Sequence, residues 1–285
     1  MPPGPVYSGP VRFGISVPNI GEVDTLIELG VAADAAGWDG FFLWDHLRFS
    51  KDSPVAVVDP WVVLGALAAR TERVRLGTLV TPVARRRPWK LARETVTLDH
   101  LSGGRVVFGV GLGYPPDADF ELVGEDPDDR VRAAKLDEGL EVLTRLWSGE
   151  SFDFEGEHLH VRETEFHPTP LQRPRIPIWV AGMWPNRAPF RRAARFDGVV
   201  PIGLDEHGLP ASLSSGELAE VVAYVREHRT TEEPFEVVHG GAPDPSAIAA
   251  SEAAGATWYL PDAGVEGPGW EEPTLELIRS SPPSA

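Results

Sequence analysis

Residues 73–114 constrain the fold more than any other stretch of the chain, because two short apolar runs flank a segment with helical spacing. The runs are residues 75–80 and 106–110, and residues 88–101 lie between them. Two buried strands joined by one helix form a parallel β-α-β unit. Ligands of such units bind beyond the carboxyl ends of the strands, so the loops that follow both strands are expected to face one site.

The same alternation continues on both sides of this unit. Strands are expected at residues 11–17, 40–44, 75–80, 106–110, 178–181, 198–201, 235–239 and 257–260. Helices are expected at residues 24–36, 59–69, 88–101, 130–147, 187–195, 217–228, 245–254 and 274–279, with Asp24 and Asp59 as N-caps of the first two. This pattern is typical of a TIM barrel. The alternative, a doubly wound open sheet, usually has a glycine-rich turn directly after its first strand, and VPNIGE at residues 17–22 does not fit one.

Three segments fall outside the alternation. Residues 1–10 are expected to be an irregular leader, and residues 151–177 to hold a hairpin insertion. Residues 114–129 are too long for an ordinary turn and are interpreted as a lid or binding loop. Since no internal repeat or long linker is visible, one domain over residues 1–285 is expected.

The composition excludes several kinds of site and partner. A chain without cysteine has no disulfides, no thiolate catalysis and no cysteine-bound metal. A formal charge of -17 argues against nucleic acid or an anionic membrane as a partner. Neither a long apolar run nor a secretory signal is visible, so a cytoplasmic location is expected. The expected partner is a small-molecule substrate, and a homodimer is left open.

His46 is the leading candidate for proton transfer among the residues that follow the strands. Imidazole titrates near neutral pH, and Asp45 beside it can hold the ring charged or oriented. The alternative is a strand-end histidine that only hydrogen-bonds a loop. Adjacent strand residues point to opposite sides, so Asp45 and His46 are not expected to share a metal ion, and no metal site is predicted.

Glycines and aromatic residues follow the fourth and fifth expected strands. Gly109, Gly111 and Gly113 resemble a dinucleotide loop only superficially. They are expected to let a flat ring or a backbone approach closely, with a simple tight turn as the alternative. The candidates for walls of the substrate pocket are the aromatic residues Trp44, Tyr114 and Trp184.

Several motifs together resemble the bacterial luciferase-like monooxygenase family, in particular the branch that uses the deazaflavin coenzyme F-420. They are GWDGFFLWDH, the segment from DPWVVLGALAARTERVRLGTLVTP to DHLSGGRVVFGVGLG, IPIWVAG, and AARFDG. The resemblance covers residues 11–198, and the last third of the chain is poorly matched.

The resemblance implies a TIM-barrel oxidoreductase that binds coenzyme F-420, or alternatively FMN, at the barrel mouth. It makes His46 the catalytic candidate beside the cofactor. It also implies a bulged third strand with a non-proline cis peptide at Thr78 and Leu79, and a tail-binding turn at Ala181 and Gly182. The expected cofactor-binding residues are Asp45, Thr78, Leu79, Gly111, Gly113, Ala181, Gly182, Arg85 and Arg87.

The arginine run at residues 85–87 favours coenzyme F-420 over FMN. The coenzyme carries a long anionic tail, which an acidic chain should repel unless cations are placed locally. Arg85, Arg86 and Arg87 are expected to project from the loop after the third strand, and Arg187 to serve the phosphate. The alternative is that these arginines pair with the chain's own acids or with a partner subunit.

The expected function is hydride transfer between the cofactor and a small organic substrate, or flavin-dependent monooxygenation. The alternative is a catalytically silent cofactor-binding protein of the same fold. A cofactor-free lyase or isomerase would need a lysine or paired carboxylates at the strand ends, and neither is visible. Sugar-phosphate dehydrogenases of the family carry a glutamate after the glycine element. This chain has Tyr114 there, so glucose-6-phosphate is not the expected substrate, and the aromatic rim suggests a partly apolar one.

Overall fold

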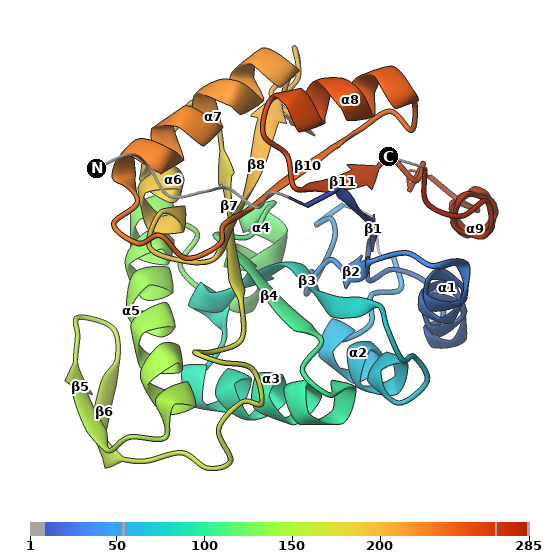
Figure 1. Ribbon diagram of the computed structural model, residues 1–285. Helices are drawn as coiled ribbons and strands as arrows, with labels where there is room; N and C mark the ends of the chain where they lie inside the picture. The colour runs from blue at the N-terminus through green and yellow to red at the C-terminus, as the bar shows by residue number, and fades with distance from the viewer. Residues whose placement is uncertain (1–8, 53–54, 266, 284–285) are drawn as a thin grey trace.

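A closed barrel of parallel strands forms the centre of the computed structural model, which describes residues 9–52, 55–265 and 267–283 (Figure 1). Within these residues the barrel strands are β1 (Arg12–Val17), β2 (Gly40–Leu43), β3 (Arg75–Pro82), β4 (Val106–Gly111), β7 (Ile178–Met183), β8 (Gly198–Leu204), β10 (Glu236–Gly241) and β11 (Trp258–Pro261). Neighbours pair in chain order, and the pairings of β8 with β10 and of β11 with β1 close the circle. The predicted TIM barrel is therefore confirmed.

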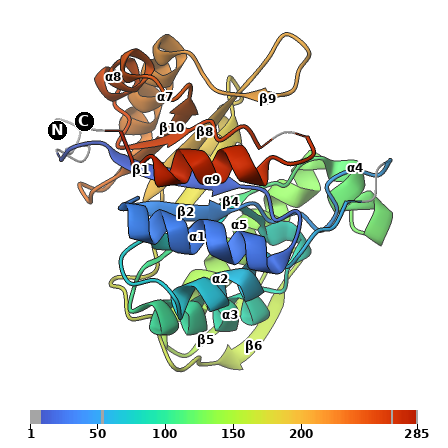
Figure 2. The ribbon, with the colours of Figure 1, turned by 90° about the vertical axis from the view of Figure 1, so that its right-hand side faces the viewer.

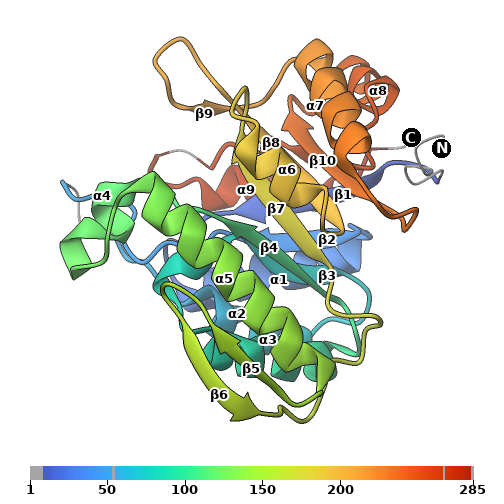
Figure 3. The same cartoon turned by 90° about the vertical axis from the view of Figure 1, so that its left-hand side faces the viewer.

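Helices follow the strands and surround the barrel, as Figures 2 and 3 show. They are α1 (Val23–Ala36), α2 (Pro60–Ala68), α3 (Pro88–Ser102), α5 (Asp129–Ser148), α6 (Ala188–Ala193), α7 (Ser215–His228), α8 (Pro245–Ala253) and α9 (Glu271–Arg279). Asp59 caps α2 as predicted, because its side chain accepts hydrogen bonds from the backbone N–H groups of Trp61 and Val62. Asp24 does not cap α1. That helix begins one residue earlier, so Asp24 lies in its first turn, where the negative charge of an acidic side chain interacts favourably with the helix dipole.

Short elements occupy the segments outside the alternation. An antiparallel hairpin of β5 (Phe152–Glu155) and β6 (His160–Thr164) lies within residues 151–177 and beside α5 (Figure 3). Residues 114–129 are not a plain loop, because they contain α4 (Pro116–Asp119) and the 3-10 turn η2 (Glu121–Val123). A second 3-10 turn, η1 (Val83–Arg85), follows β3, and β9 (Pro210–Ala211) pairs with the end of β8. Of the expected leader, residues 1–8 lie outside the described residues.

Aromatic and aliphatic side chains fill the barrel interior. Phe42, Val107, Trp179, Val238 and Trp258 form one buried cluster. Further along the strands, the inward-facing side chains are only partly buried, and they pack on this cluster from the carboxyl side; they are Leu79, Val200 and Leu260. The interior of the barrel is therefore filled by the buried cluster, and apolar side chains line its mouth at the carboxyl ends of the strands. Within the described ranges, no helix is long and apolar enough to cross a membrane.

Candidate active site

A buried amide holds the backbone that carries His46. Asn19, which follows β1, donates from Nδ2 to the His46 carbonyl at 2.9 Å and accepts the His46 N–H at Oδ1 over 3.1 Å. The same Nδ2 donates to the Val58 carbonyl at 2.7 Å. Because Asn19 is fully buried, the position of His46 after β2 is determined by the neighbouring strand end as well as by its own.

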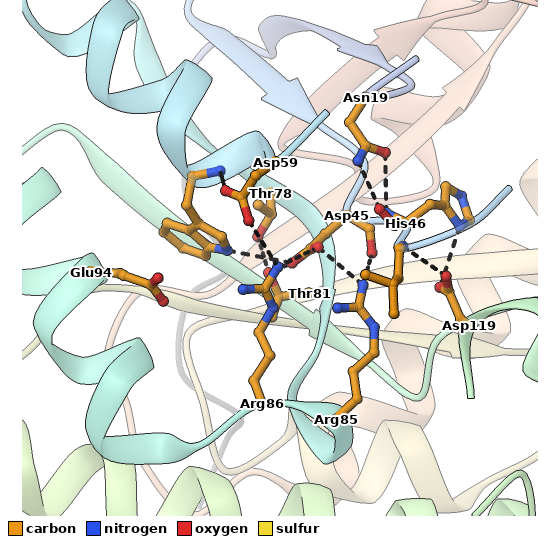
Figure 4. A network of polar contacts seen from close by, with 12 residues as sticks. Asn19, Asp45, His46, Asp59, Thr78, Thr81, Arg85, Arg86, Glu94 and Asp119 are labelled. Atoms are coloured by element: carbon orange, nitrogen blue, oxygen red, sulfur yellow. Dashed lines mark hydrogen bonds and ion pairs between the residues drawn. The ribbon is translucent and has the colours of Figure 1, made fainter. Parts of the chain in front are cut away.

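The imidazole of His46 faces a buried carboxylate that the sequence analysis did not identify (Figure 4). Its Nδ1 lies 3.4 Å from Oδ2 of Asp119, whose side chain is only 1% exposed. The other carboxylate oxygen, Oδ1, accepts the backbone N–H groups of Leu47 at 2.8 Å and Arg48 at 3.1 Å. Asp119 lies in the segment interpreted as a lid. In the sequence, the one indication that this segment is structured is Pro116, because proline suits the first turn of a helix.

Two aromatic rings pack around the imidazole. Trp44 meets it edge-on with ring centroids 5.8 Å apart, and Phe49 does so at 5.2 Å. Trp44 is held in turn, because its indole N–H donates to Ser16 Oγ at 3.1 Å. The structure therefore brings Trp44 beside His46, with Phe49 as a further apolar neighbour that the sequence analysis did not single out.

Asp45 points away from His46 into a cluster of donors (Figure 4). Its Oδ1 pairs with Nη2 of Arg86 at 2.6 Å and of Arg85 at 3.1 Å, and Thr81 Oγ1 donates to Oδ2 at 2.8 Å. Trp61 Nε1 completes the cluster at 3.4 Å. Burial acts to raise the pKa of Asp45, but the charges of Arg86 and Arg85 and the hydrogen bonds from Arg86 and Thr81 outweigh it and leave the pKa below its usual value.

This cluster corrects the expected arrangement of the arginine run. Arg85 and Arg86 do not project toward a cofactor tail, because both guanidinium groups turn inward onto Asp45. Only Arg87 is exposed, with its guanidinium carbon 5.8 Å from the centroid of the Trp89 ring. The alternative, in which the arginines pair with the chain's own acids, is therefore correct for two of the three arginines. Their pairing also engages the carboxylate of Asp45, which is then not free for a cofactor.

The third strand is irregular close to the expected place. The register between β3 and β4 shifts between Thr78 and Thr81, and the peptide bond Leu79–Val80 is cis, one residue later than expected. Thr78 is fully buried and shares a hydrogen bond of 2.9 Å with Thr81, so its hydroxyl supports the bulge. Leu79 is the residue of this group that remains partly exposed inside the barrel.

The glycines in β4 and directly after it have different structural roles. A Cβ on Gly109 would lie 2.1 Å from the Thr78 carbonyl oxygen, so this glycine admits the neighbouring backbone, which was one of the expected alternatives. A Cβ on Gly111 would lie 2.7 Å from Val80 Cγ2. Gly113 has φ +88°, a left-handed conformation that suits glycine, and leads the chain into α4.

The end of β7 differs from the expected turn. Ala181 and Gly182 lie inside the strand, because β7 extends to Met183, and Gly182 allows close packing of Pro189 from α6. Trp184 is only 6% exposed and packs edge-on against Phe190 at 5.2 Å, so it does not form an open wall. Tyr114, in contrast, is 42% exposed near the start of α4.

Two arginines near the end of β7 are held by aromatic rings. Arg187 lies over Trp184 at 3.7 Å and over Tyr224 at 4.8 Å from the ring centroids. Arg191 donates from Nη1 to the Tyr224 hydroxyl at 3.2 Å. Within residues 9–52, 55–265 and 267–283, neither guanidinium has a carboxylate at ion-pair distance. The same ranges contain no group of three His, Asp or Glu arranged to hold a metal ion.

Comparison with known sequences finds one family over most of the chain. The family profile described as luciferase-like monooxygenase matches residues 10–242. A relative from Microbacterium testaceum, named F-420-dependent glucose-6-phosphate dehydrogenase, is 37% identical over 183 residues, which are 62% of this chain and 52% of the relative. A protein of the same name from Nakamurella multipartita is 36% identical over 197 residues, 67% and 56% of the two chains. This chain thus spans about half the length of the curated relatives that it matches.

Solved structures of more distant proteins share the fold. Coenzyme F-420-dependent tetrahydromethanopterin reductase from Methanopyrus kandleri superposes with a TM-score of 0.73 at 17% identity, over 96% of this chain and 99% of that one. An F-420-dependent secondary alcohol dehydrogenase, in complex with an F-420–acetone adduct, gives a TM-score of 0.73 at 17% identity, over 89% and 93% of the two chains.

Proposed function

Because the chain belongs to the luciferase-like monooxygenase family, we propose that it is an oxidoreductase that uses coenzyme F-420 and a small organic substrate. The observation that carries the proposal is His46, an ionisable group at the carboxyl end of β2 that a buried amide and a buried carboxylate both position. In (β/α)8 barrels this end of the strands is where active sites lie.

The barrel mouth fits a flat, largely apolar ring. Leu79, Val200 and Leu260 are partly exposed there and rest on the buried interior cluster. Gly111 has no side chain and Ala181 has only a methyl group, and a Cβ built on Gly111 would lie 3.7 Å from Ala181 Cβ. These two neighbouring positions therefore place little side-chain bulk under the ring. These residues would hold the ring of the coenzyme, which supplies hydride transfer when it is bound.

His46 then moves the matching proton. Oxidation of an alcohol releases a hydride from the carbinol carbon and a proton from the hydroxyl oxygen. Nε2 of His46 would accept that proton, and in the reverse direction it would return it to the carbonyl oxygen. Trp44 and Phe49 give the imidazole apolar neighbours.

The test has two stages. We expect quenching of protein fluorescence to show binding of coenzyme F-420, and oxidised coenzyme to be consumed when a panel of small alcohols and glucose-6-phosphate is added. His46→Ala should bind the coenzyme normally but turn over about 10²–10⁴ times more slowly. His160→Ala, which removes an exposed imidazole from the hairpin strand β6, is the matched control.

Two results would count against the proposal. Tight binding of FMN with no binding of coenzyme F-420 would overturn the choice of cofactor. Binding of coenzyme F-420 without any turnover, under conditions that support an F-420-dependent dehydrogenase, would favour a silent cofactor-binding protein.

A further inference from the structure

We infer that Asp119 is the positioning residue of His46, and that it places the imidazole proton on Nδ1 so that Nε2 is free to act as a base. The inference rests on the proposed function only for the consequence in turnover, because the placement of the proton is a property of the protein alone.

The contacts of Asp119 leave one oxygen for His46. Oδ1 accepts two backbone N–H groups, whereas Oδ2 is buried and has no hydrogen-bond partner. Nδ1 of His46 is also buried without a hydrogen bond, and these two atoms face each other at 3.4 Å. A buried carboxylate oxygen without a donor is costly, and Nδ1 can relieve that cost only if it carries a proton.

The ring therefore divides into a buried side and an open side. The His46 side chain is 15% exposed although Nδ1 is buried, and Nε2 makes no hydrogen bond within the described chain. A neutral imidazole has one N–H donor, so donation from Nδ1 leaves the lone pair on Nε2. When Nε2 takes a proton, Asp119 also stabilises the imidazolium. The contact of 3.4 Å is longer than an aligned hydrogen bond, as is common for catalytic pairs before ligands bind.

Other charged groups near this pair are engaged elsewhere. Asp117, on the same short helix, pairs with Lys51 at 3.0 Å. Arg48 directs its guanidinium to the carbonyls of Ser50 and Lys51. Asp45, the sequence neighbour of His46, is bound to Arg85 and Arg86 on the other side of the strand end. Asp119 is thus the carboxylate that faces the ring, although no spacing in the sequence connects the two.

The decisive variant is Asp119→Asn, because it keeps the hydrogen bonds to the backbone after His46 but moves the imidazole proton to the other ring nitrogen. The amide oxygen can still accept the N–H groups of Leu47 and Arg48, which places the amide NH₂ against Nδ1. That NH₂ donates, so Nδ1 must accept and the ring proton moves to Nε2, where it blocks the base. We expect kcat with coenzyme F-420 to fall on the order of 10²–10⁴-fold, while KM and coenzyme binding change little.

The matched control is Asp117→Asn, which makes the same chemical change two residues earlier on a side chain that is 35% exposed. It should leave kcat within about twofold, because surface substitutions of this kind have small effects. Equal losses of kcat in Asp117→Asn and Asp119→Asn, or unchanged kcat in both, would overturn the inference.

A second measurement does not depend on turnover. Nitrogen-15 NMR of histidine-labelled protein without cofactor, with the His46 signals assigned by their loss in His46→Gln, reports which ring nitrogen carries the proton. We expect Nδ1–H in the parent and Nε2–H in Asp119→Asn. Nε2–H in the parent would refute the inference even if the protein proves to be an F-420 enzyme. Nδ1–H in a protein that lacks turnover would uphold it and count against the proposed function instead.

Discussion

Two pairs of arginines in this acidic chain have opposite surroundings. Arg85 and Arg86, after β3, turn inward onto the buried carboxylate of Asp45, and their side chains are 6% and 16% exposed. Arg187 and Arg191, after β7, contact aromatic rings and no carboxylate within the part of the chain that the structure describes. The first pair shares the carboxylate of Asp45, and Arg86 also lies 4.0 Å from Oδ2 of Asp59, whereas the second pair has no carboxylate partner among the described residues.

This difference shows that a run of like charges in a sequence does not identify a binding site. Arg85 and Arg86 stabilise the connection between the ends of β2 and β3, and removing one member of such a buried group leaves an uncompensated charge. Stacking on Trp184 and Tyr224 orients Arg187 without consuming its charge. We therefore propose that Arg187 and Arg191, rather than Arg85 and Arg86, meet the anionic tail of the cofactor.

The largest expected effect is on stability when the buried pair is broken. Asp45→Ala should lower the free energy of unfolding by about 3–5 kcal/mol, because two guanidinium groups then lose their shared carboxylate. The double variant Arg187→Gln with Arg191→Gln should change it by less than about 1 kcal/mol. Urea unfolding followed by tryptophan fluorescence measures both. Similar losses in the two variants would mean that the two arginine pairs are not different in kind.

A smaller effect is expected on cofactor binding. Arg187→Gln with Arg191→Gln should weaken coenzyme F-420 by about 2–10-fold, since partly exposed ion pairs contribute roughly 0–1 kcal/mol each, and the remaining affinity should depend less on salt. FMN, which lacks the long tail, should lose less affinity. The control is Arg70→Gln with Arg162→Gln, which removes two exposed charges. Arg70 lies just after α2 and Arg162 lies in β6. An equal loss of affinity in this control would mean that the change in net charge, and not the position of Arg187 and Arg191, weakens binding.

The smallest expected effect appears only in acid. The pKa of Asp45 lies below its ordinary value of 3.8 in the folded protein. The unfolded chain therefore binds a proton first, so stability from this group is complete above pH 3.8 and is lost as the pH falls below it. Asp45→Asn should flatten the acid limb of a plot of unfolding free energy against pH. An unchanged limb would mean that other acids with lowered pKa values, such as Asp34, dominate it.

Local patterns in the sequence were sufficient for the architecture. The alternation of apolar runs and helical spacing predicted each barrel strand to within a few residues, because strand and helix periodicity depend on near neighbours. Asp59 followed by proline predicted the start of α2, and the glycines of β4 indicated a close approach that Gly109 makes with the Thr78 backbone. Alternation along a strand also separated Asp45 from His46 correctly.

Only the tertiary structure decided which partners these residues have. Leu43 and Thr78 are paired across β2 and β3, and this pairing brings Arg85 and Arg86 onto Asp45, which lies about forty positions earlier in the chain. The segment of residues 114–129 brings Asp119 back to His46 across a longer separation, more than seventy positions. Such contacts depend on the closure of the barrel and not on local spacing. The sequence by itself therefore determined the barrel and the position of His46, whereas the direction of each charge was decided by which strand ends the closed sheet makes neighbours.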